Sequence, residues 1–231
     1  MSRKLTASLL ILAAVLANVA FTALGSIFDY PDVLDEPAGQ ILSAFRADEG
    51  AISAWFVVLA FSAALLAPVA IGVGRLSADR RMRIAVRVGI AAAVVQVVGL
   101  LRWPLLVPGY ASDAASADGG VAASARDAFQ TAHDVLGVAI GETVGYLLTG
   151  TWTILVLVAL GRRYAGRWFQ LLGGAGAVLI LVGVLGPLDL PGVDGANFVG
   201  YVLWSVWLIV FAVVILVHER RGAAVPAAVT S

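Results

Sequence analysis

Glu142 and Arg102 are the charged residues whose positions most directly suggest chemistry. Glu142 lies in the apolar stretch AIGETVGYLL, and Arg102 lies in the equally apolar GLLRWPLL. A charge inside hydrocarbon is costly, so it is either compensated by a partner or used in function, for example in proton transfer. The first question is therefore whether these two charges serve each other or a ligand.

Helix geometry places the two charges at similar depth. Glu142 follows Asp134 by eight residues, which is about 12 Å of helix, and Arg102 precedes Pro108 by six residues, about 9 Å. We favour a structural Arg102–Glu142 pair, in which each charge relieves the other's desolvation. Two alternatives stay open: Glu142 as a proton carrier or cation ligand, and Arg102 extending back to the membrane surface.

Three glycines accompany Glu142 on the same segment. Gly137, Gly141 and Gly145 recur at a spacing of four residues. Small residues at this period let another helix approach closely, so we predict a packing role for them and not ligand binding. Because Glu142 is adjacent to this stripe, we expect it to face protein.

The two histidines are predicted to play local roles. On an ideal helix the nine residues from His133 to Glu142 rotate through about 900°, so the two side chains face opposite ways. A His133–Asp134–Glu142 cluster is therefore not expected unless the helix is kinked. The other histidine, His218, belongs to the opposite membrane face, about 30 Å away, which excludes haem ligation by both histidines.

The remaining polar candidates are Asn18 and Gln96 within spans, and Asp29, Tyr30 and Asp32 in a connection. We expect Asn18 and Gln96 to form hydrogen bonds between helices. Together with Asp35 and Glu36, the carboxylates of Asp29 and Asp32 could ligate a hard cation, but EF-hand spacing is absent and a solvated face is favoured. The chain has no cysteine, which excludes disulfides and thiolate sites, and it has no phosphate-loop, dinucleotide or HExxH motif. No metal or cofactor is predicted.

The composition identifies the elements that must position these residues. Of the 231 residues, 61% are hydrophobic and 13% are charged. Spanning the hydrocarbon takes about 20 apolar residues in a helix. We therefore predict an all-α integral membrane protein, a single-domain bundle of six transmembrane helices at 7–25, 51–74, 84–107, 135–160, 168–188 and 196–217.

The distribution of basic residues predicts that both termini are cytoplasmic. The connections on the opposite side of the membrane from these basic residues are acidic. We favour a retained first helix over a cleaved signal peptide, because its apolar run exceeds about 15 residues. Of the 15 basic residues, twelve fall on the predicted cytoplasmic side: Arg3, Lys4, Arg75, Arg80, Arg81, Arg83, Arg87, Arg162, Arg163, Arg167, Arg220 and Arg221.

Two outer connections differ in character. Within the connection 26–50 we predict a short amphipathic helix over Glu36–Arg46, lying at the interface or capping the bundle. The connection 108–123 is small, polar and predicted to be mobile. Ser124 and Asp127 then resemble a capping box, so we expect the fourth helix to begin outside the membrane and enter it as one long rod.

Three stretches resemble a known family. They are IFDYPDVLDEPAGQILSAF, AWFVVLAFSAALLAPVAIGVG and AHDVLGVAIGETVGYLLTGTWTILVLVAL. Together they are similar to an uncharacterised family of bacterial multi-pass membrane proteins, a domain of unknown function of about this length. The resemblance implies one six-helix domain, and it provides no catalytic residue to transfer.

These observations favour a non-enzymatic protein of the bacterial inner membrane that binds or senses a stimulus, or regulates another component. Besides the lipid bilayer, the basic connections could contact a cytoplasmic protein or anionic lipid. Their arginines follow topology and do not indicate nucleic-acid binding. The alternative is a small-solute or proton-coupled transporter or channel with Glu142 on its path. A membrane-embedded enzyme is least supported, because no nucleophile and base converge.

Overall fold

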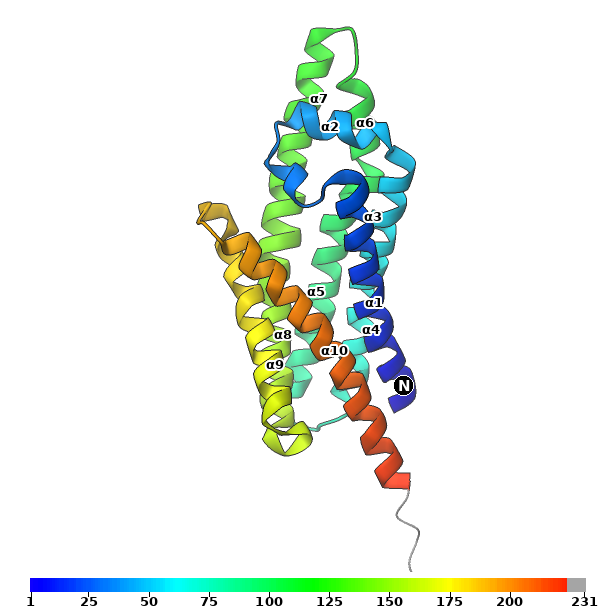
Figure 1. Ribbon diagram of the computed structural model, residues 1–231, viewed down its shortest axis with the longest axis vertical. Coiled ribbons are helices and arrows are strands. Elements are labelled where there is room, and N and C mark those ends of the chain that lie inside the picture. Colours follow the sequence, from blue (N-terminus) through cyan, green and yellow to red (C-terminus); the bar gives the residue numbers. More distant parts are fainter. Residues whose placement is uncertain (224–231) are drawn as a thin grey trace, which may run out of the picture.

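A computed structural model describes residues 1–223, with side chains to Arg220, and shows six long apolar helical segments (Figure 1). The predicted all-helical fold with six segments able to span a membrane is confirmed. By length and composition these segments are Arg3–Phe28, Glu49–Gly74, Arg80–Asp113, Gly119–Leu160, Arg162–Leu188 and Val193–Arg220.

Several spans consist of more than one helical element. The elements in chain order are α1 (Arg3–Phe28), η1 (Asp32–Asp35), α2 (Ala38–Ala47), α3 (Glu49–Ala64), α4 (Leu66–Gly74), α5 (Arg80–Leu105), α6 (Val107–Asp113), α7 (Gly119–Ala132), η2 (His133–Val144), α8 (Gly145–Leu160), α9 (Arg162–Val182), η3 (Gly183–Leu188) and α10 (Val193–Ala223). Here η1 and η3 are 3₁₀ segments and η2 is a π-helix.

Proline explains two of the internal breaks. Pro68 has no N–H to donate to the carbonyl of Ala64, which is the last residue of α3. Pro104 lies in the last turn of α5 and Pro108 in the first turn of α6, with the chain bending at Leu106 between them. The third span therefore continues as helix past its predicted end at residue 107.

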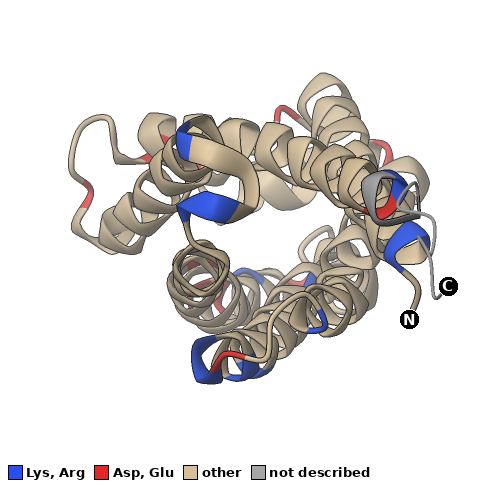
Figure 2. Ribbon diagram, turned by 90° about the horizontal axis from the view of Figure 1, so that it is seen from below, with Lys and Arg blue, Asp and Glu red and all other residues tan. Residues whose placement is uncertain are grey.

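The spans form a closed ring in chain order. Each span packs against the next, from α1 through α3 and α4, α5, α8 and α9 to α10, and α10 packs back against α1. Figure 2 shows this ring along the bundle axis. We call the end with the N-terminus and the end of α10 the terminal face, and the opposite end the capped face (Figure 1).

Two apolar cores fill this ring at different heights. The core toward the terminal face joins α1, α4, α5, α8, α9 and α10 around Trp152, Trp207 and Phe211, which are all fully buried. The core toward the capped face joins α1, η1, α2, α3, α5, α6 and α7 around Trp103, which stacks on Phe56 at a centroid distance of 4.7 Å. The fifth and sixth spans therefore contribute no buried side chain to that second core.

Helix α2 lies across the capped face, as Figure 1 shows. It buries Ile41, Leu42 and Phe45, the apolar positions that fall on one face of the short helix predicted there. The Phe45 ring stacks on Trp103 at 5.9 Å. This helix therefore covers the second core.

The connection predicted to be mobile over 108–123 is mostly helical, so the prediction is wrong for all but its middle residues. Helices α6 and α7 occupy most of it and leave 114–118 between them. The N-cap of α7 is Asp118, which accepts hydrogen bonds from the amides of Gly120 and Val121, so the predicted cap at Ser124 is wrong. Alanine has a high helix propensity, and Pro108 at the start of α6 and the Asp118 cap of α7 favour helix at both ends of this stretch. These effects outweigh the preference of small polar residues for loops.

The fourth span is one continuous helix of 42 residues, Gly119–Leu160. At about 1.5 Å per residue it is roughly 60 Å long, or about twice the hydrocarbon thickness. Its α7 part accordingly projects beyond the other spans at the capped face (Figure 1), as expected for a rod that enters the membrane from outside.

Candidate functional site

The π-helix η2 is the local feature that organises the site. It runs from His133 to Val144 and contains Gly137, Gly141 and Glu142. π-helices are rare, are mostly single turns within α-helices, and occur frequently at functional sites. Twelve residues in this conformation set η2 apart from every other described part of the chain.

Glycines let η2 and α5 touch through their backbones. A Cβ built on Gly99 would lie 2.7 Å from the Cα of Gly141 and 2.9 Å from the carbonyl oxygen of Leu136. A Cβ on Gly145 would meet Gln96 at 3.1 Å, and one on Gly137 would meet the Arg102 guanidinium at 2.7 Å. The predicted glycine stripe thus lies along α5.

Arg102 points from α5 onto this stripe. Its side chain is 5% exposed, and its Nη1 donates a hydrogen bond to the carbonyl oxygen of Gly99 at 2.7 Å. Its Nη2 lies 3.4 Å from Nδ1 of His133, and its guanidinium carbon lies 5.2 Å from the centre of the Trp103 ring. The buried Nε has no hydrogen-bond partner.

Glu142 is not among the hydrogen-bond partners of Arg102. The predicted pair is therefore not seen as a direct contact; the guanidinium contacts Gly99 and His133 instead. Both charges nevertheless lie close to Tyr30 in the connection after α1. Burial raises the pKa of Tyr30 to about 12; the nearby Glu142 adds to the rise and Arg102 opposes it.

The π-helix also changes where His133 points. The prediction of opposite faces for His133 and Glu142 assumed an ideal α-helix, whereas a π-helix has more residues per turn. His133 faces Arg102 and stacks on Phe129 at 6.1 Å. Asp134 is exposed and accepts a hydrogen bond from the Gln130 amide at 2.9 Å, so it does not join a cluster with His133 and Glu142.

Below Glu142, polar side chains continue toward the middle of the bundle. Gln96 of α5 donates a hydrogen bond to the Thr149 hydroxyl at 2.7 Å, and the Trp204 indole of α10 donates one to Thr153 at 2.8 Å. Thr149 and Thr153 are fully buried. We call this series the polar column: Arg102, Glu142, Tyr146, Gln96, Thr149, Tyr201, Thr153 and Trp204.

Two tyrosines link the upper and lower parts of the polar column. Tyr146 of α8 and Tyr201 of α10 pack edge to face with ring centres 5.7 Å apart, and Tyr201 contacts Trp204 at 6.1 Å. Sequence reasoning missed both tyrosines. The signal was present, since Glu142, Tyr146, Thr149 and Thr153 recur at helical spacing on one span.

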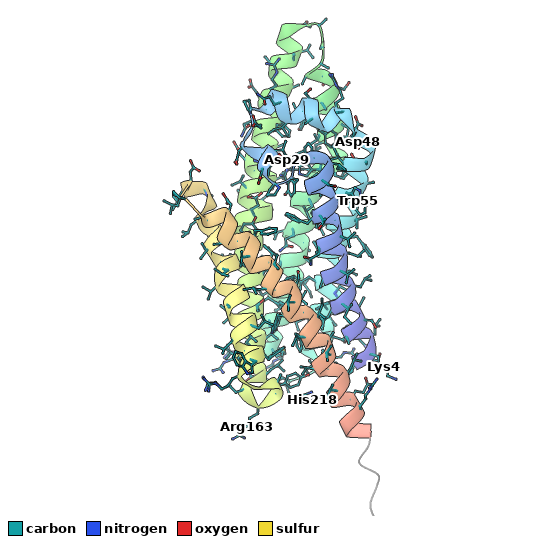
Figure 3. All side chains as sticks on the ribbon, viewed as in Figure 1. Lys4, Asp29, Asp48, Trp55, Arg163 and His218 are labelled. Atoms are coloured by element: carbon teal, nitrogen blue, oxygen red, sulfur yellow. The ribbon has the colours of Figure 1, made fainter. Side chains whose placement is uncertain are left out.

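The other predicted positions lie outside this column. Asn18 is exposed and donates its hydrogen bond to the Ala14 carbonyl within α1, so it does not link helices there. Asp29 and Asp32 are exposed at the capped end; Figure 3 labels Asp29. His218 lies at the terminal face in the same view, and no group of three metal-ligating side chains occurs within residues 1–220.

Comparison with known proteins gives a family and no activity. Residues 5–212 match the model of a family described as "Domain of unknown function (DUF4386)". No curated protein and no solved structure matches the chain.

Proposed function

The chain belongs to the DUF4386 family, whose function is unknown, so we propose a function from its geometry. We propose that the protein is a non-enzymatic sensing or regulatory component of the bacterial inner membrane. In this proposal the polar column receives a stimulus from the capped face, which is the outer one, and the basic terminal face transmits it to a cytoplasmic partner or to anionic lipid.

The incompletely satisfied charge of Arg102 carries this proposal. Placing an arginine at the centre of a span costs about 2.5–3.5 kcal/mol in insertion measurements. Here the guanidinium has no carboxylate among its hydrogen-bond partners and its Nε has none at all. A buried charge left in this state favours a second arrangement, in which a ligand or Glu142 satisfies it. A sensor requires a group of this kind, whose surroundings can switch between two arrangements.

The extent of the polar column favours sensing over transport. The column ends at Thr153 and Trp204, and Trp152 and Trp207 fill the ring beyond it. A transport path has to reach both membrane faces, whereas a receptor site can end inside the bundle. The ring beyond the column is packed with apolar side chains toward the terminal face, which supports a site that does not continue to that face.

The charges at the terminal face support the proposed orientation and partner. Basic residues gather at that end of the ring in Figure 2, and Lys4 and Arg163 mark it in Figure 3. Cytoplasmic ends of membrane proteins carry such an excess of Arg and Lys. A basic face of this kind attracts the anionic lipids of the inner leaflet or an acidic protein surface.

Transport is the second candidate, because the polar column extends along the fourth span to Thr153, near the end of that span at Leu160. A conformational change that opens the terminal core would complete a path past Glu142. The two candidates differ in what Glu142 does: in a transporter it carries a proton or a cation, and in a sensor it shifts the equilibrium between two arrangements of the bundle.

One variant separates these functions. Glu142→Gln removes the buried acid, and Asp134→Asn makes the same change at an exposed position of the same helix. For a sensor we expect Glu142→Gln to change amide hydrogen exchange at the terminal-face ends of α4, α5, α8 and α9 by at least about fivefold. We expect Asp134→Asn to leave this exchange unchanged, and proteoliposomes of all three proteins to show no proton flux.

Two outcomes would contradict the proposal. Proton flux in the unmodified protein that disappears in Glu142→Gln would establish the transporter instead. Identical hydrogen exchange and identical flux in Glu142→Gln and the unmodified protein would assign Glu142 to structure alone.

A further inference from the structure

A hollow lies at the capped face, apart from the polar column, between α2 and the α6–α7 hairpin. Its volume is about 230 Å³. This is smaller than the pockets of about 300–1,000 Å³ that hold drug-sized molecules, so it suits a small ion or one group of a larger molecule. Its lining is Gly39, Leu42, Ser43, Arg46, Ala111, Ala114, Ala115 and Arg126.

The charges of this hollow are unusual for their location. Arg46 of α2 and Arg126 of α7 both line it, and no acidic residue does. Apart from the buried Arg102, they are the basic residues that the described chain places on the capped side, where acidic connections prevail. Two guanidiniums of the same sign at one small hollow repel each other unless an anion lies between them.

Local structure accounts for only one of these arginines. Arg46 lies in the last turn of α2, where its positive charge interacts favourably with the helix dipole. Arg126 lies in the middle of α7, where the dipole has no such effect. Its stem crosses Gly39, since a Cβ built there would lie 3.5 Å from the Arg126 Cδ. Neither guanidinium donates a hydrogen bond to another described residue.

The remaining lining fits an oxyanion. The fork of N–H donors on a guanidinium matches the oxygens of phosphate or carboxylate, and two such forks match a phosphate group better than a single carboxylate. The Ser43 hydroxyl adds one more donor. The alanines and Gly39 leave room without competing as acceptors. The acids Asp113 and Asp118 line a separate hollow between α6 and α7.

We propose that this hollow binds a phosphate group between Arg46 and Arg126. The group is either a free phosphate or the headgroup of a phospholipid in the leaflet at the capped face. The site is independent of the sensing function proposed above, because it uses none of the residues of the polar column.

The test measures binding of ³²P-labelled inorganic phosphate to the full chain in a maltoside detergent, by equilibrium dialysis. We expect saturable binding that weakens at least about tenfold in Arg126→Gln, because a charge-assisted hydrogen bond is lost. Ala115→Leu fills the hollow without changing charge and should weaken binding similarly. Arg163→Gln, the same substitution at the terminal face, should have no effect.

A second arm identifies the source of the phosphate. Soluble dihexanoyl-phosphatidylglycerol is titrated against the same proteins by native mass spectrometry. Binding of this lipid without binding of inorganic phosphate, lost in Arg126→Gln and Ala115→Leu, supports a headgroup site. Binding of neither probe, or binding that Ala115→Leu and Arg126→Gln leave unchanged, overturns the proposal.

Discussion

At the residue scale, Arg102 shows how a buried charge can be held without an ion pair. The carbonyl of Gly99 and the imidazole of His133 accept hydrogen bonds from its two Nη atoms, and the Trp103 ring lies within cation–π range. These contacts lower the cost of burial but leave Nε without a partner. The side chain is therefore buried with one of its N–H groups unsatisfied.

Tyr30 gives a pH-dependent test of this environment. Its pKa in the folded protein is about 12, above its ordinary value of 10.0, chiefly because of burial. The folded state therefore binds the phenolic proton more tightly than the unfolded state does. The stability contributed by neutral Tyr30 is complete below pH 10 and is lost as the pH rises through about 12.

We predict that Tyr30→Phe removes this part of the pH dependence. The measurement is the free energy of unfolding in detergent between pH 8 and about 12, together with tyrosinate absorbance. Tyr110→Phe, at the same end of the molecule, serves as the control and should follow the unmodified protein. Equal slopes for Tyr30→Phe and the unmodified protein would show that Tyr30 is not in the environment described.

At the element scale, the crossing of α5 and η2 fixes the position of the site. Gly99 and Gly141 bring the two backbones into contact, and this contact sets the distance at which Arg102 reaches His133. The glycines also free η2 from side-chain crowding in a conformation that few sequences adopt. The position of the Arg102 guanidinium therefore depends on the close packing of these glycines.

Gly99→Ala tests this crossing. The new Cβ would lie 2.7 Å and 2.9 Å from backbone atoms of η2, which cannot turn aside as a side chain can. We expect a loss of about 1–3 kcal/mol in the free energy of unfolding. Gly174→Ala in α9, where a Cβ meets open space, should be neutral or stabilising by up to about 1 kcal/mol. Equal stability of both variants would contradict the close approach.

At the scale of the whole molecule, a ring of six spans holds one apolar core toward each face, and the polar column lies beside them in the interior. The closure of α10 on α1 completes the ring. Basic residues lie at the terminal face, and acidic connections lie at the capped face.

The orientation can be measured directly because the chain has no cysteine. Ala78 and Ala117 are exposed in connections at opposite faces. We predict that a membrane-impermeant maleimide labels Ala117→Cys in intact cells and labels Ala78→Cys only after permeabilisation, because basic connections stay in the cytoplasm. The unmodified protein is the blank. Labelling of Ala78→Cys alone in intact cells would reverse the proposed orientation.

The sequence was sufficient for the features that depend on composition and spacing. Apolar runs of membrane length required helices, since backbone groups in lipid have to bond within their own segment. The same reasoning placed the glycine stripe at an interface, where Gly99 and Gly141 meet, while the similar depth of Arg102 and Glu142 stays a prediction. It failed for 108–123, where a cap at Asp118 and a proline start convert a polar stretch into helix.

Tertiary structure alone decided the partners of the buried groups. His133 reaches Arg102 only because η2 is a π-helix, and no spacing rule for an α-helix predicts that rotation. Tyr146 and Tyr201 meet only because the ring brings the fourth and sixth spans together. Local sequence determines which segments are helices and how deep they lie, because those depend on single-helix energetics. Which side chains meet depends on the crossing of whole helices, and that is a property of the assembled ring.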